Sequence, residues 1–273
     1  MIDAVLLFRE ALYGTLVIAV GCSVLGVYVV LRRIVFVGAA LAEISSAGIG
    51  LALWLAGLGV LPGLAGHPLA ISLLVTMAGV AFFATPSRGD IPPDASIGVA
   101  YAVAAAAGIL FIAAAKSGEA HDIYLQGNIL GITRRDTLLL LAAVLPVLVA
   151  HLVFYKEFLF VSFDRETART LGYRVARWDL ALYLTLGVVI ACAMQFAGVM
   201  LVFNFLVLPA VTGLYIGGSM RATFTVSVGS ALLAAIVGFA ASIPLDLPSG
   251  PTIIAVSGLL TFLAWGARRA RGA

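Results

Sequence analysis

The sequence predicts an all-α, polytopic membrane protein with about eight to nine transmembrane helices. Hydrophobic residues make up 63% of the 273 residues and charged residues only 11%, whereas a soluble domain has roughly 25% charged residues. The apolar residues also gather in long runs, and about 20 apolar residues suffice for one helical crossing. Strands of a membrane barrel would instead alternate in polarity over about ten residues.

Nine apolar runs are the candidate crossings. In chain order they cover residues 11–31, 40–60, 68–84, 95–115, 137–155, 178–195, 197–216, 223–243 and 251–267. The breaks between them are Arg32-Arg33, residues 61–67, 85–94, 116–136 and 156–177, Gln195 with Gly198, and residues 217–221 and 244–250. The break at Gln195 and Gly198 is weak, and without it the count falls to eight. Little sequence remains outside the runs, so residues 1–273 are predicted to form a single transmembrane domain.

The distribution of basic residues predicts the orientation. With the amino terminus outside, the cytoplasmic side receives Arg32, Arg33, Arg88, Lys156, Arg165, Arg169, Arg174, Arg177, Arg221, Arg268, Arg269 and Arg271, and the outside receives Arg9, Lys116, Arg134 and Arg135. Cytoplasmic loops carry such an excess. The carboxyl terminus is then cytoplasmic, which requires an odd number of crossings. The net charge is only +3, without a dense basic run, so no nucleic-acid partner is expected.

A cytoplasmic loop is predicted at about 156–178, the longest polar interruption of the chain. Within it Asp164 is a suitable N-cap, Glu166 lies where the helix dipole favours an acid, and Gly172 is typical of a helix end. A short helix on the cytoplasmic face is therefore expected. It is either a docking element for a partner or a solvated connection held at the interface by Arg and Trp side chains.

The sequence offers no sign of a cofactor site. A Walker A loop needs Gly-Lys followed by Ser or Thr, and neither of the two lysines, Lys116 and Lys156, follows a glycine. Cys22 and Cys192 lie in apolar runs without metal-type spacing. Any ATP and magnesium would be used by another subunit, and this chain is expected to bind no cofactor itself.

Six segments carry a family pattern. They are Leu31-Arg32-Arg33 with Phe36-Val37-Gly38 and Ala40-Leu41; Asp94-Ala95-Ser96-Ile97-Gly98-Val99; Gly127-Asn128-Ile129-Leu130-Gly131 with Asp136; Val161-Ser162-Phe163-Asp164 with Glu166, Ala168, Arg169 and Gly172; Leu206-Val207-Leu208-Pro209-Ala210; and Leu245-Asp246-Leu247-Pro248-Ser249-Gly250. In this order they resemble the membrane permease subunit of the bacterial zinc/manganese/iron ABC importers. The resemblance covers nearly the whole chain.

The resemblance implies a type II ABC importer-like permease, surrounded by lipid of the bacterial cytoplasmic (inner) membrane, which pairs with a second copy of itself around a central path. It also implies a cognate ABC ATPase dimer beneath the membrane and an extracytoplasmic metal-binding protein above it. The short loop helix would then be the coupling helix seated on the ATPase. Its coupling residues would be Asp164, Glu166, Ala168, Arg169, Leu171 and Gly172.

One departure from the family pattern concerns the metal path. After the double arginine the family typically carries Gly-Asp-x-Leu-x-His, which places an acid and an imidazole on one helix face. Here the acid position is Ala39 and the histidine position is Glu43. Glu43 is therefore a candidate metal ligand, whose oxygen atoms suit manganese or iron(II) at least as well as zinc. The alternative is an interfacial Glu43 that pairs with Arg32 or Arg33 near the helix start.

Other polar residues carry weaker predictions. His121 and Asp122, with Glu119, cluster on the predicted outer side, either as a point of metal capture or as a hydrated loop. Asn204, like Gln195, is expected to form an interhelical hydrogen bond.

Two functions are open at this stage. The first is the permease subunit of an ATP-driven importer of divalent metal ions, with zinc, manganese and iron as possible cargoes. The second is a proton-coupled secondary carrier that needs no ATPase and uses Glu43 as its proton site. An enzyme has the least support, because no Ser/His/Asp group or carboxylate pair converges within the runs.

Overall fold

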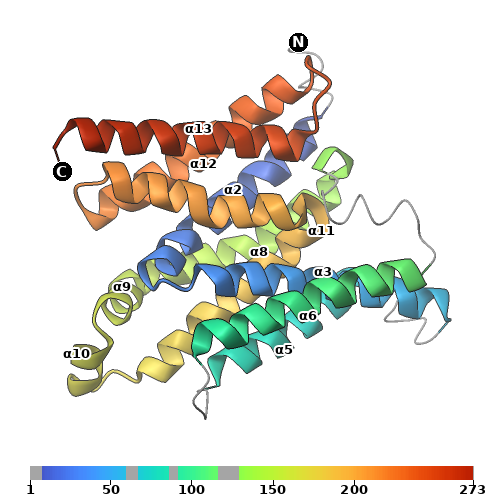
Figure 1. The fold of residues 1–273 in the computed structure, drawn as a ribbon, viewed down its shortest axis with the longest axis horizontal. Coiled ribbons are helices and arrows are strands. Elements are labelled where there is room, and N and C mark those ends of the chain that lie inside the picture. The colour runs from blue at the N-terminus through green and yellow to red at the C-terminus, as the bar shows by residue number, and fades with distance from the viewer. Residues whose placement is uncertain (1–7, 60–66, 86–91, 116–128, 273) are drawn as a thin grey trace.

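The structure is a computed structural model that describes residues 8–59, 67–85, 92–115 and 129–272, and in that part every regular element is a helix. In chain order these are α2 (Arg9–Leu31), α3 (Val35–Gly57), α5 (Pro68–Ala84), α6 (Pro93–Ala114), η1 (Ile129–Gly131), α8 (Arg134–Val153), α9 (Tyr155–Phe163), α10 (Arg165–Thr170), α11 (Val175–Ile216), α12 (Met220–Ser242) and α13 (Ser249–Ala270). The long helices form one bundle (Figure 1). The predicted fold class, an all-α polytopic membrane protein, is confirmed.

The long helices correspond to the predicted crossings. Seven of the described helices are long and apolar enough to span a membrane, and the apolar helix α5 is shorter, with 17 residues. Helix α11 has 42 residues, so as a straight rod it would be about 63 Å long, about twice the hydrocarbon thickness of a bilayer. It is not straight, because its backbone leaves the helical conformation at Gly198.

Gly198 divides α11 into a first arm, 175–197, and a second arm, 199–216. Its φ of 69° and ψ of 166° lie in a region of backbone space that is essentially restricted to glycine. Figure 1 shows that both arms run from this break toward the end of the bundle that holds α10. Each of the nine predicted runs thus corresponds to a helix or to one arm of α11, which supports nine crossings rather than eight.

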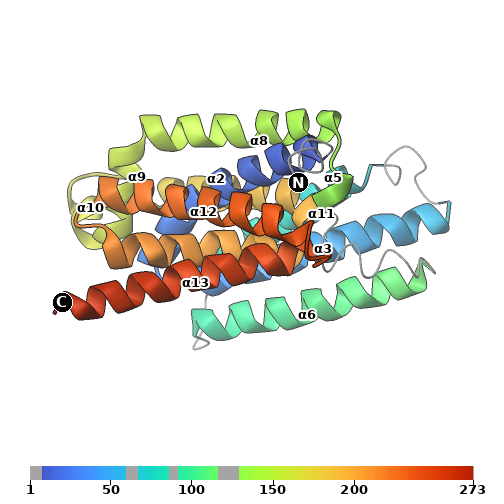
Figure 2. The same ribbon diagram turned by 90° about the horizontal axis from the view of Figure 1, so that it is seen from above.

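Helices α2, α3 and α11 form the centre of the bundle. The most apolar stretch of each is 67%, 78% and 72% buried, compared with 22% to 33% in α6, α8, α12 and α13. Figure 2 shows α8 and α6 on opposite sides of the bundle. These outer helices carry exposed apolar side chains, such as Leu152 on α8 and Phe262 on α13. Such surfaces suit contact with lipid.

The first described helix begins at one end of the bundle and the last described helix finishes at the other. Helix α13 ends at the same end of the bundle as α9 and α10, whereas α2 begins toward the opposite end, near η1 (Figures 1 and 2). The turn from α2 into α3, residues 32–34, lies at the α10 end and is called the elbow below. This arrangement agrees with the odd number of crossings that the sequence predicts.

Helix α3 begins at Val35, five residues before the predicted run. Arg33 has a φ of 59°, which lets the elbow turn the chain within three residues. The residues that follow are mostly apolar and continue directly as helix. Glu43 is therefore the ninth residue of α3 and does not lie near its start.

Candidate functional site

Glu43 is a buried carboxylate in the most buried helix of the bundle. Only 8% of the residue is exposed, and within the described part of the chain its carboxylate forms no hydrogen bond or ion pair. The alternative in which Glu43 pairs with Arg32 or Arg33 is wrong. Nine residues lie between Arg33 and Glu43, and the chain is helical from Val35 through Glu43, which corresponds to about 12 Å of helical rise. Arg32 instead pairs with Asp179.

A cavity of about 610 Å³ lies on the face of α3 that also carries Glu43. It is lined by Phe36 and Ala39 of α3, by Asp94, Ile97, Gly98 and Tyr101 of α6, and by Val199, Met200 and Phe203 of the second arm of α11. Ala39 and Phe36 precede Glu43 by four and seven residues, so all three lie along one side of the helix. Glu43 is not itself part of the lining, and the cavity lies on the α10 side of it, beside Ala39 and Phe36.

Asp94 contributes a carboxylate to the lining of this cavity. Ala39, which occupies the acid position of the family pattern, contributes none. Asp94 also lines a second cavity of about 460 Å³ at the α10 end, together with Arg165, Arg169 and Asp179. Asp94 and Ile97 are the residues common to both linings. Sequence reasoning used Asp94 only as part of a family segment. Its position in the first turn of a membrane helix, after two prolines, was the available signal.

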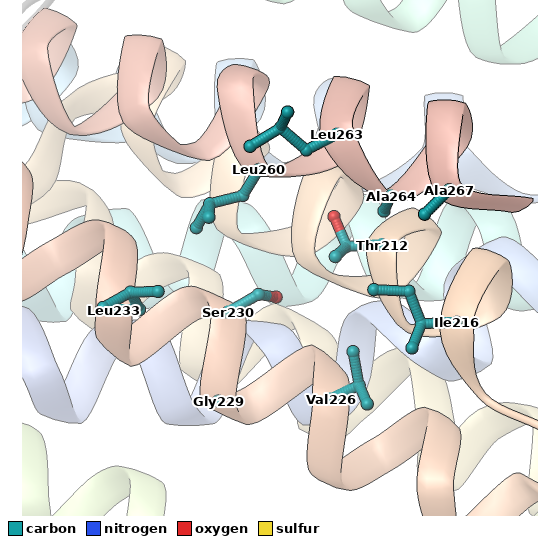
Figure 3. Close-up of a pocket in the computed structure, with 10 residues that line it drawn as sticks. All are labelled: Thr212, Ile216, Val226, Gly229, Ser230, Leu233, Leu260, Leu263, Ala264 and Ala267. Carbon is teal, nitrogen blue, oxygen red and sulfur yellow. The ribbon is translucent and has the colours of Figure 1, made fainter.

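A third cavity has a different character. Figure 3 shows it as a groove between α12 and α13, over the second arm of α11. It is lined by Thr212, Ile216, Val226, Gly229, Ser230, Leu233, Leu260, Leu263, Ala264 and Ala267. None of these side chains is charged, and two hydroxyls are their polar groups. The groove thus lacks the carboxylate or imidazole ligands that bind divalent cations.

The predicted loop helix is present as α10, Arg165–Thr170. Asp164 caps it, because its side chain accepts hydrogen bonds from the Thr167 amide at 2.9 Å and the Thr167 hydroxyl at 2.6 Å. Gly172 follows with a φ of 86°. The predictions of an N-cap and of a helix end are confirmed.

One side of α10 is anchored and the other is exposed. Ala168 is fully buried against Val161 of α9 and Val175 of α11, so it cannot touch a partner directly. Five of the predicted coupling residues are exposed, namely Asp164, Glu166, Arg169, Leu171 and Gly172. The exposed side of α10 is therefore available to a partner, and Leu171 gives it an apolar contact, with 65% of the residue exposed.

We expect Asp164→Ala to loosen α10. Hydrogen bonds from Thr167 hold the pKa of the Asp164 carboxyl below its usual range, so the cap is complete at neutral pH and weakens as the pH falls through that lowered pKa. Hydrogen exchange at the Thr167 amide should therefore speed up severalfold in Asp164→Ala at neutral pH. Asp164→Asn is the control, because asparagine also caps helices. Unchanged exchange in the alanine variant would contradict the capping role.

A charged network joins α10 to the elbow. Arg165 Nη2 donates to Asp179 Oδ2 at 2.8 Å, and Arg32 Nη1 donates to Asp179 Oδ1. Arg32 Nε also donates to Ser162 Oγ of α9 at 2.8 Å. The side chain of Arg32 is only 3% exposed, that of Asp179 is 21% exposed and that of Arg165 is 52% exposed.

The remaining metal predictions lie elsewhere. His121 and Asp122, with Glu119, fall outside the described residues. Within residues 8–59, 67–85, 92–115 and 129–272, no group of three or more His, Cys, Asp or Glu residues could hold a metal ion. In that part of the chain, the candidate metal path therefore rests on the single carboxylates of Glu43 and Asp94.

The prediction of an interhelical hydrogen bond for Asn204 is wrong. Asn204 is 4% exposed, and both polar atoms of its amide are buried without a partner among the described residues. Burial alone therefore did not bring a polar group within hydrogen-bonding distance of this side chain. The side chain of Gln195 likewise forms no hydrogen bond in the described part of the chain, although its backbone belongs to helix α11.

Comparison with known proteins identifies the family. The model of the ABC 3 transport family matches residues 5–267. The chain belongs to the ABC 3 transport family. The resemblance carried by the six segments is confirmed, and the chain is a multi-pass membrane protein of this permease family.

Proteins similar to this chain match it along nearly its whole length. The manganese transport system membrane protein MntC of Listeria innocua is 28% identical over 259 residues, which cover 94% of this chain and 89% of the relative. The "Probable iron transport system membrane protein" of Haemophilus influenzae is 28% identical over 252 residues, which cover 90% of this chain and 88% of the relative. A solved structure, PsaBC from Streptococcus pneumoniae in complex with Fab, contains a chain with a similar fold. The TM-score is 0.84 at 23% sequence identity, and the match covers 97% of this chain and 94% of that chain. At that identity the likeness concerns the fold.

Proposed function

We propose that this chain is the permease subunit of an ATP-driven ABC importer that moves divalent metal ions, with manganese and iron(II) as the first candidates and zinc as the third. Family membership and relatives named for manganese and iron transport support this assignment. The observation that carries it within the chain is Glu43, a buried carboxylate of the central helix α3. It lies on the same helix face as Phe36 and Ala39, which line a cavity that opens to the surface of this single chain. Ionisable groups are costly in membranes and mark ion pathways.

The proposed path descends from Glu43 to the α10 end. A metal ion would meet the Glu43 carboxylate, enter the cavity lined by Phe36 and Ala39, and pass Asp94 into the second cavity. Carboxylate oxygens bind manganese and iron(II) well, and the imidazole that favours zinc is missing at position 43. A second copy of the chain would close the path from the other side.

The proposed energy source lies outside the chain. The exposed side of α10 is the surface offered to an ABC ATPase dimer, which would bind and hydrolyse ATP with magnesium. The α10 end is then cytoplasmic, in agreement with the excess of basic residues on that side. An extracytoplasmic metal-binding protein would deliver the ion at the opposite end. This arrangement gives the amino terminus an outside location.

The test is metal uptake into vesicles that contain the chain with its cognate ATPase and binding protein. Mn²⁺, Fe²⁺ and Zn²⁺ are supplied separately. Each metal is tested with and without ATP on the side of the vesicle membrane where the ATPase is bound. ATP-dependent uptake of at least one metal is expected, and vesicles that lack the ATPase should take up none. ATP hydrolysis without uptake of any metal would reject the cargo. Proton-driven uptake by the chain alone would favour the secondary carrier instead.

A further inference from the structure

The contact between α10 and the membrane helices has two parts. Ala168 packs with Val161 and Val175, and Phe160 and Trp178 cover this small cluster. These contacts join α10 to the end of α9 and the beginning of α11. Since close packing resists deformation, the three segments move together as one block when α10 is pushed.

The block is joined to the elbow through one buried side chain, Arg32. Its Nη1 binds Asp179 of α11 and its Nε binds Ser162 of α9, whereas its Nη2 has no partner in the described part of the chain. A buried guanidinium needs a counter-charge close by. Asp179 supplies it, and the same carboxylate also holds Arg165, the first residue of α10.

The elbow leads directly to the proposed metal path. Helix α3 begins three residues after Arg32, and its first turns carry Phe36 and Ala39, which line the large cavity, followed by Glu43. A shift of the elbow therefore moves the cavity wall and the carboxylate together, because a helix transmits a displacement of its end along its axis. The elbow has only three residues between the two helices, so it is too short to absorb such a shift by local rearrangement.

We propose that Asp179 is a positioning residue that transmits the movement of α10 to the elbow and so to the wall of the metal path. This inference rests on the proposed function, since it assigns the link between the ATPase surface and the path. Asp179 holds the first residue of α10 with one carboxylate oxygen and the buried Arg32 with the other. Charge-assisted hydrogen bonds of this kind fix both distance and direction.

The sharpest test breaks the exposed half of the network. Arg165→Gln removes the contact between α10 and Asp179, and the protein should still fold because the Arg165 side chain is 52% exposed. The matched control is Arg177→Gln, an exposed arginine on the same end of α11 that forms no ion pair in the described part of the chain. Both variants are assembled with the ATPase and the binding protein in vesicles. Mn²⁺ uptake and ATP hydrolysis are measured in the same preparation.

We expect Arg165→Gln to hydrolyse ATP at close to the wild-type rate while Mn²⁺ uptake per ATP falls by about fivefold, the lower range of coupling between two sites. Arg165→Lys should restore part of the ratio, and Arg177→Gln should keep all of it. Asp179→Asn should lower the ratio further, and adding Arg165→Gln to it should have no additional effect. Because Arg165 also lines the second cavity, the double variant separates loss of the Asp179 contact from loss of a charge in that cavity. If Asp179→Asn fails to assemble, Asp179→Glu, which keeps the charge but lengthens both contacts, takes its place.

Two results would overturn the inference. One is a wild-type ratio in Arg165→Gln, and the other is a parallel loss of hydrolysis, uptake and assembly, which would indicate a purely structural contact. In both cases the wild-type complex still transports, so the proposed function stands. A wild-type complex without ATP-dependent Mn²⁺ uptake would instead overturn the choice of Mn²⁺ as cargo and this inference with it.

Discussion

Glu43→Gln is expected to reduce Mn²⁺ uptake by the assembled transporter at least about tenfold, because loss of even an outer partner of a metal ligand costs about 10- to 100-fold. The amide keeps the shape of the side chain but removes the charge that attracts a divalent cation. ATP hydrolysis should continue, since Glu43 lies in the third turn of α3 and is not part of α10, the surface proposed to contact the ATPase. Uptake is measured in vesicles with the ATPase and the binding protein present.

The folded state should tolerate this change well. Glu43 is 8% exposed and has no partner in the described part of the chain, and burial of a charge without a partner is unfavourable. Thermal unfolding in detergent should therefore occur at the same temperature or higher in Glu43→Gln. The control is Glu10→Gln, which removes an acid in the first turn of α2, 28% exposed and paired with Arg9. Wild-type uptake in Glu43→Gln would exclude the carboxylate from the metal path.

The positions of the helices were accessible from the sequence because apolar runs report them directly. Even the weakest break, at Gln195 and Gly198, corresponds to the interruption of α11. Helix starts were less accessible. Val35 and the residues after it are apolar, as are those of the run itself, and only the tight elbow at Arg33 determines where α3 begins.

The site was accessible only in part. A sequence shows that Glu43 is an acid in an apolar run, but its burial and its distance from Arg33 depend on where α3 begins. The pairing of Arg32 with Asp179 joins residues that are 147 positions apart. The second cavity that includes Asp94 is formed by α3, α5, α6, α10 and α11 together. Such contacts follow from packing between helices and leave no local pattern.

Among glycine-to-alanine substitutions in the described core, Gly26→Ala is expected to destabilise the protein most. Gly26 is buried in α2, and a Cβ atom there would clash with the backbone oxygen of Leu206 and lie 2.8 Å from its carbonyl carbon. A flexible side chain could move aside, but the backbone of α11 cannot. The two central helices would have to separate, and overpacking of this kind costs about 1–3 kcal/mol or more.

The measurement is thermal unfolding of the purified chain in detergent, with Gly258→Ala as the matched control. Gly258 lies within α13, where an added Cβ would meet nothing within 4 Å. Alanine there should be neutral or stabilise the helix by about 0.5–1 kcal/mol, because glycine is a poor helix former. Gly26→Ala should therefore lower the unfolding temperature, whereas Gly258→Ala should leave it unchanged or raise it. If they unfold at the same temperature, α2 and the second arm of α11 do not approach closely at Leu206, and the centre of the bundle must be packed through other contacts.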